Sequence, residues 1–218
     1  GVLNAEATGM QKGFARPGYF FIDTNGVIRE KFFEPKYRER LTGNSIIAKL
    51  FPELGQEVTD TVDAPHLQLA LEQSDRIGVP GTRITLAAEV LLPPEVHVYA
   101  PGAQGYRPIK LVIDTTPEME LKPAIYPASK ILYLPAISER VPVFEGTCRI
   151  SQDVRVSSSS EFWGSLGTEG KTFTITGKLE YQACDKTKCY FPTSVPVKWL
   201  LQVFPLDRTR APLNIRHK

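Results

Sequence analysis

Two of the three cysteines in this sequence stand close together, in a pattern that permits sulfur chemistry. Cys184 and Cys189 flank the tetrapeptide 185–188, between two segments with the alternation of strands. If those strands form a hairpin, the cysteines face each other at about 4.5–5.5 Å between Cα atoms, and a disulfide needs about 4.4–6.8 Å. Closing so short a loop contributes about 2 kcal/mol. Such a bond fits a structural staple and an exchangeable disulfide equally well.

The strand alternation also gives an expectation for the exposure of the two sulfurs. Cys184 has the parity of the polar Lys178, so we predict it on the solvent face of its strand. Cys189 has the parity of the apolar Val195. A one-residue slip near Phe191 is therefore expected, because it brings both sulfurs to one side.

The remaining candidate residues point to structural roles. Cys148 lies in a predicted strand, where a lone cysteine behaves as a small buried residue. Zinc needs four ligands, and beyond the pair only Cys148 and three scattered histidines are available. Of these, His97 is expected to be structural, since no serine or aspartate pattern of a hydrolase accompanies it. There is no glycine-rich phosphate loop, and we expect neither a metal nor a cofactor.

Most of the chain shows the alternation of half-buried strands. The sequence has 16 glycines and 18 prolines, which favours many turns over long helices. Strands separated by such turns predict a two-sheet antiparallel sandwich. Apolar residues alternate over 67–71, 84–92, 109–113, 150–156, 173–181 and 195–203. Residues 55–64 are polar and acidic and are expected to be a linker, and 207–218 a tail.

Residues 1–54 have a different pattern. Two apolar runs surround Asp23–Gly26 and predict a hairpin, and helical spacing follows after Pro35, with an interruption near Thr42 and an end at Pro52. The stretch from Arg16 to Ile28 resembles the C-terminal half of a redoxin, a thioredoxin-like domain. The resemblance implies a fragment of that fold with a cis Arg16–Pro17 bond. Because residues 1–54 lack cysteine, a peroxidase activity of this chain is excluded.

The cysteine segment carries a second resemblance. Residues 177–192, GKLEYQACDKTKCYFP, together with 97–102, HVYAPG, resemble the N-terminal domain of the thiol–disulfide interchange protein DsbD. This implies that residues 65–206 form an immunoglobulin-like antiparallel β-sandwich. It also implies that Cys184 and Cys189 are a redox pair which exchanges with thioredoxin-like proteins or domains. The compartment implied is the periplasm, although residues 1–18 lack the apolar core of a secretory signal.

Charge and hydropathy narrow the classes of partner. The net charge is +2, which gives no electrostatic footprint for nucleic acid. No run approaches the roughly 18 apolar residues of a membrane helix, so membrane insertion is not expected. Two hypotheses remain: a thiol–disulfide exchange module, acting as an oxidoreductase component, or a non-catalytic immunoglobulin-like binding module with a structural disulfide.

Overall fold

The computed structural model describes residues 3, 5, 8–9, 12–34, 39–54, 57–134 and 138–207, and most of them lie in strands. One large sheet has the strand order β10-β13-β7-β5-β4, with β3 beside β7. A second has the order β6-β16-β14-β9. The strands of the first are β3 (Arg40–Leu41), β4 (Glu57–Ala64), β5 (Leu67–Gln73), β7 (Thr82–Leu91), β10 (Met119–Leu121) and β13 (Thr147–Val156). Those of the second are β6 (Ile77–Gly78), β9 (Lys110–Ile113), β14 (Lys171–Tyr181) and β16 (Thr193–Val203).

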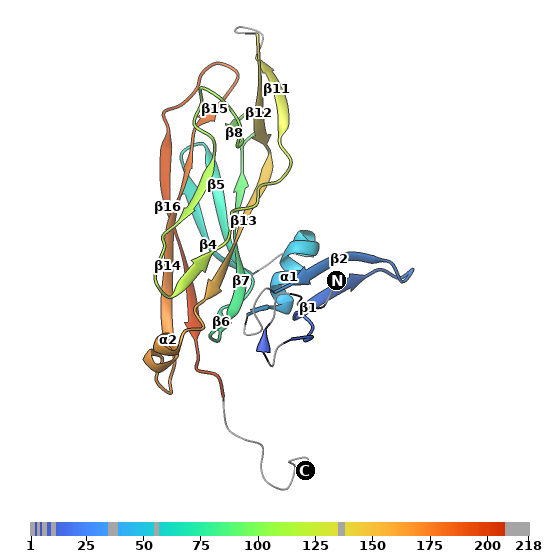
Figure 1. The fold of residues 1–218 in the computed structure, drawn as a ribbon. Coiled ribbons are helices and arrows are strands. Elements are labelled where there is room, and N and C mark those ends of the chain that lie inside the picture. Colours follow the sequence, from blue (N-terminus) through green and yellow to red (C-terminus); the bar gives the residue numbers. More distant parts are fainter. Residues whose placement is uncertain are drawn as a thin grey trace, which may run out of the picture.

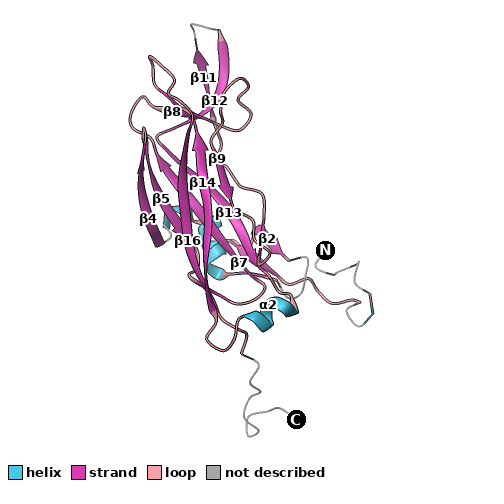
Figure 2. Ribbon diagram, turned by 90° about the vertical axis from the view of Figure 1, so that its left-hand side faces the viewer, coloured by secondary structure: helices cyan, strands magenta, loops and turns pink. Residues whose placement is uncertain are grey.

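The two larger sheets enclose one apolar core. Their long strands run side by side along the length of the molecule (Figure 2). Alternate residues point inward, as in β16, where Val195, Val197, Trp199, Leu201 and Val203 are buried and their neighbours are not. Burial of one face is what the alternation predicted for such a strand, whereas in β7 residues on both faces are buried. The predicted mainly β fold, an immunoglobulin-like antiparallel sandwich, is confirmed. The short helix α2 (Ser160–Ser165) adds Phe162 to this core.

A smaller third sheet lies at one end of the sandwich. Its order is β11-β12-β8-β15, with β8 (His97–Tyr99), β11 (Lys130–Leu134), β12 (Glu139–Glu145) and β15 (Ala183–Cys184). Figure 1 shows it at the top, where β11 and β12 extend beyond the other strands. A separate apolar cluster packs on this sheet; its buried members are Tyr99, Ala103, Val141, Val143 and Cys184.

The N-terminal part is a hairpin and a helix beside the sandwich (Figure 1). Strands β1 (Gly18–Ile22) and β2 (Ile28–Phe33) pair as predicted, and Gly26 in their turn has φ +78°. The helix α1 (Gly43–Leu50) is shorter than expected. Thr42 caps it, because its Oγ1 accepts a hydrogen bond of 3.0 Å from the Ser45 N–H. Before it, residues 40–41 pair with β7 as β3; residues 35–38 lie outside the described part. A short 3₁₀ turn, η2 (Pro52–Leu54), follows the helix.

Buried ion pairs hold this N-terminal part against β7 and β13. Glu34 lies 2.8 Å from Arg83, and Lys49 lies 2.8 Å from Asp153. Burial raises the pKa of the Glu34 carboxyl, while Arg83 opposes that shift. Removing one partner of such a pair is costly, because it leaves a buried charge uncompensated. The hairpin and helix are therefore fixed to the sandwich through matched charges.

Two sequence expectations for this region are wrong. The segment 55–64 is not a linker, since 57–64 form β4, paired with β5. As the outer strand of its sheet, β4 keeps most side chains in solvent, which explains its polar composition. The Arg16–Pro17 bond is not cis, because no described peptide bond is. The thioredoxin-like origin of 1–54 stays a prediction, and of the expected tail only Asp207 is described. No helix in the described residues is long and apolar enough to cross a membrane.

Candidate redox site

Cys184 and Cys189 are joined by a disulfide at the end of the third sheet. Their Cα atoms are 4.0 Å apart, and the two residues form an isolated antiparallel bridge, so they face each other as expected. Cys184 ends β15 and pairs in register with His97 of β8. Cys148 is buried and free. Burial raises the pKa of its thiol to about 12, which keeps it protonated and inert.

The loop between the cysteines is held by one carboxylate. Asp185 Oδ1 accepts hydrogen bonds from the backbone N–H groups of Thr187 and Lys188, at 2.7 and 2.9 Å. Its Oδ2 accepts from the Tyr190 hydroxyl at 2.5 Å. These donors, the Thr187 hydroxyl foremost, hold the pKa of the Asp185 carboxyl well below its usual range. The loop therefore has a turn structure of its own that does not depend on the sulfur–sulfur bond.

The two cysteine residues differ sharply in exposure. Cys184 is only 1% exposed, whereas Cys189 lies on the surface. The expectation that Cys184 faces solvent is wrong, because β14 ends at Tyr181 and the chain passes at Gln182 into a different sheet. The alternation of β14 therefore does not continue to Cys184. The structure has this change of sheet in place of the predicted slip near Phe191.

Tyr99, on β8, reaches both sulfurs. Its hydroxyl oxygen lies 3.2 Å from Cys184 Sγ and 3.3 Å from Cys189 Sγ. Since disulfide sulfurs carry no hydrogen, the hydroxyl is the donor in these contacts. Burial, assisted by Tyr106 and Glu139, raises the pKa of Tyr99 to about 12, so it keeps its proton at neutral pH. Tyr106 stacks on its ring with centroids 4.1 Å apart.

Sequence reasoning missed this tyrosine as a site residue. Tyr99 lies 85 positions before Cys184, and the two meet only because β8 pairs with β15. The signal that could have identified Tyr99 was the HVYAPG motif, which contains it and resembles the same family as the cysteine segment. His97 is buried as expected of a structural histidine, and burial lowers the pKa of its imidazole.

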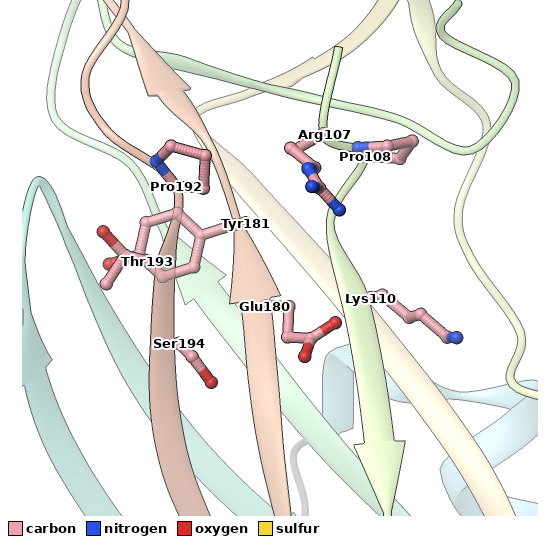
Figure 3. Close-up of a pocket in the computed structure, with 8 residues that line it drawn as sticks. All are labelled: Arg107, Pro108, Lys110, Glu180, Tyr181, Pro192, Thr193 and Ser194. Carbon is pink, nitrogen blue, oxygen red and sulfur yellow. The ribbon is translucent and has the colours of Figure 1, made fainter.

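A surface pocket of about 400 Å³ lies next to the disulfide segment (Figure 3). The side chain of Gln182 links the two regions: its Oε1 accepts from the Arg107 backbone N–H at 3.4 Å, and its Nε2 donates to the Tyr190 carbonyl at 3.1 Å. The lining residues are Arg107, Pro108, Lys110, Glu180, Tyr181, Pro192, Thr193 and Ser194. The described residues include no group of three or more His, Cys, Asp or Glu side chains placed to hold a metal.

In a comparison with known protein families, one family model matches the chain. The model described as "Thiol:disulfide interchange protein DsbD, N-terminal" matches residues 68–199. No curated protein matches the chain. Among solved structures, the N-terminal periplasmic domain of ScsB from Proteus mirabilis is 11% identical, with a TM-score of 0.42 over 66% of this chain and 49% of that one. The DsbD N-terminal domain of Neisseria meningitidis, in the reduced form, is also 11% identical, with a TM-score of 0.35 over 54% and 80%. The matched part thus spans about half the length of the ScsB chain.

Proposed function

Because this chain belongs to the family of DsbD N-terminal domains, we propose that it is a thiol–disulfide exchange module. In this proposal it passes reducing equivalents between thioredoxin-like partners through Cys184 and Cys189, in the periplasm or another extracytoplasmic compartment. An oxidising compartment of that kind is where protein disulfides persist. The observation that carries the proposal is the disulfide itself: one of its two cysteine residues is exposed, and one hydroxyl lies within hydrogen-bonding distance of both sulfurs.

The difference in exposure supports one order of events in this proposal. A partner thiolate attacks the Sγ of Cys189, the exposed one of the two cysteine residues, and forms a mixed disulfide with it. The Cys184–Cys189 bond breaks, and its electron pair leaves on Cys184 Sγ as a thiolate. The partner's second thiol, once deprotonated, then attacks its own sulfur in the mixed disulfide and releases Cys189. The partner is oxidised to a disulfide, and this chain is reduced to two thiols.

Tyr99 assists the step in which Cys184 leaves as a thiolate. Charge develops on Cys184 Sγ, which is buried and therefore poorly solvated by water. The Tyr99 hydroxyl stands 3.2 Å from that atom and remains a donor, because its pKa is raised to about 12. A hydrogen bond to a charged acceptor is stronger than one to a neutral acceptor. Tyr99 thus stabilises the leaving thiolate without accepting or losing a proton.

A redox titration and a rate measurement test the proposal together. We expect a potential within the range of thioredoxin-like proteins, about −270 to −120 mV. We also expect a reduced thioredoxin to reduce the pair much faster than dithiothreitol at equal concentration. A potential below about −300 mV, with no advantage for the thioredoxin, would identify a structural staple. The chain would then be the non-catalytic binding module that the sequence also allowed.

A further inference from the structure

We propose that Phe191 and the cationic pocket beside it form the surface on which the thiol partner docks. The partner that fits is a thiol protein with an apolar surface next to its reactive sulfur and carboxylates at the edge of that surface. This inference rests on the proposed exchange function and adds to it the residues that select the partner.

Phe191 places an aromatic side chain in open solvent, on a backbone segment whose neighbours are anchored. It is 92% exposed, more than any other large apolar residue in the described part of the chain. The residue before it, Tyr190, is well anchored: its ring stacks on His66 with centroids 3.5 Å apart, and its backbone N–H donates to the Ala183 carbonyl at 2.9 Å. Pro192 follows and restricts the backbone on the other side. The backbone that carries Phe191 is therefore held before a partner binds, which limits the entropy cost of binding to that of the side chain.

The exchange reaction brings a partner onto this side chain. Attack on Cys189 requires the partner's sulfur to reach bonding distance of Cys189 Sγ. Even a small redox interface covers about 600 Å² on each partner, a disc of about 14 Å radius. Phe191 follows Cys189 by two residues, so their Cα atoms are at most about 7 Å apart. A partner centred on Cys189 thus covers Phe191, and aromatic side chains are enriched in such interfaces.

The charge of the neighbouring pocket indicates which charged groups the partner carries beside its apolar surface. Figure 3 shows the Arg107 and Lys110 side chains on one side of the pocket, with Glu180 between them and Ser194. Glu180 is the single carboxylate among the lining residues that the structure describes, and its Oε1 already lies 2.6 Å from Lys178 Nζ. The pocket therefore has an excess of positive charge beside an apolar anchor. Carboxylates on the partner complement it and speed association.

Two pairs of variants test the two parts of the surface. Phe191→Ala is compared with Leu200→Ala, which truncates another exposed side chain, 57% exposed, about 30 Å further along β16. Arg107→Glu is compared with Lys171→Glu, which makes the same change in net charge near the start of β14, about 30 Å from Glu180. Each oxidised variant is mixed with a reduced thioredoxin of low isoelectric point, and separately with dithiothreitol, in a stopped-flow experiment.

We expect Phe191→Ala to slow reduction by thioredoxin about tenfold, and Arg107→Glu to slow it about threefold or more at low salt. Leu200→Ala and Lys171→Glu should match the wild type, and dithiothreitol should reduce every variant at the same rate because it needs no docking surface. If Phe191→Ala reacts with thioredoxin within twofold of the wild type, the docking inference is wrong, although the exchange function stands. If the wild type itself shows no preference for thioredoxin over dithiothreitol, the exchange function fails, and the inference with it.

Discussion

Replacing Tyr99 by phenylalanine tests the chemistry of the site most directly. The change removes one hydroxyl, which lies 3.2 Å from Cys184 Sγ and 3.3 Å from Cys189 Sγ, and it leaves the ring that packs in the small apolar cluster. The fold should therefore be retained. The lost contact is the hydrogen bond to the sulfur that departs as a thiolate.

The size of the effect follows from that one hydrogen bond. A hydrogen bond to a charged group contributes about 1.5–3 kcal/mol. Only part of the charge has developed in the transition state; a fraction of about 0.45, as for the attacking thiol, leaves about 0.7–1.4 kcal/mol. Since about 1.4 kcal/mol is a tenfold change, Tyr99→Phe should slow reduction about three- to tenfold. The effect should be the same for a thioredoxin and for dithiothreitol, because both expel Cys184.

The assay is stopped-flow reduction of the oxidised protein by dithiothreitol at pH 7 to 8, where Tyr99 carries its proton because its pKa is about 12. The matched control is Tyr106→Phe. Tyr106 stacks on Tyr99 but donates its hydroxyl to Glu139 at 3.0 Å rather than to sulfur. Equal rates for Tyr99→Phe and the wild type would refute the role given to the hydroxyl. Equal slowing by both variants would point to packing instead.

Three further outcomes follow from the small loop that the disulfide closes, from the burial of Cys148 and from the burial of His97. With both Cys184 and Cys189 changed to serine, the protein should stay folded and lose about 4–8 °C in Tm, because the bond contributes about 2 kcal/mol; melting of the reduced protein at room temperature contradicts this. Cys148, whose thiol pKa burial raises to about 12, should take up a thiol reagent only after denaturation, and labelling of the native protein would be evidence against its burial. Burial lowers the pKa of His97, so the folded state binds fewer protons than the unfolded one and stability falls as pH drops through about 6.5; an NMR titration of the imidazole with its midpoint at or above 6.5 would show that the sign is wrong.

The sandwich was predictable from sequence because strands such as β16 bury one face each. Val195 to Val203 alternates without a break, and the structure buries every second residue over that range. The strand β4 was not predictable in this way. Its burial is confined to a few positions on an outer strand, so its polar sequence, EVTDTVDA, had the composition of a linker. An alternation of apolar and polar residues indicates a strand only where one face of that strand packs on the core.

The pairing of Cys184 with Cys189 was predictable from the sequence, but the burial of Cys184 and the exposure of Cys189 were not. Facing cysteines follow from a short hairpin, which is a local property of residues 184–189. The burial of Cys184 depends on β8, a strand more than 80 residues earlier, and on the change of sheet at Gln182. The contact of Tyr99 with both sulfurs depends on the same pairing. These are tertiary properties, and alternation along a single strand contains no information about them.

In the proposed exchange, the position of the disulfide allows it to open while the domain stays folded. Cys184 packs in the small cluster on the third sheet, together with Tyr99 and Val143, and not in the core between the two larger sheets. On the side of Cys184, breaking the bond therefore changes contacts in that small cluster and not in the main core. The loop should keep its shape meanwhile, because Asp185 accepts its hydrogen bonds from Thr187, Lys188 and Tyr190 and none from sulfur. With β15 still paired to β8, the two thiols remain opposite each other. The same geometry that makes the bond a weak staple thus allows it to re-form after each exchange.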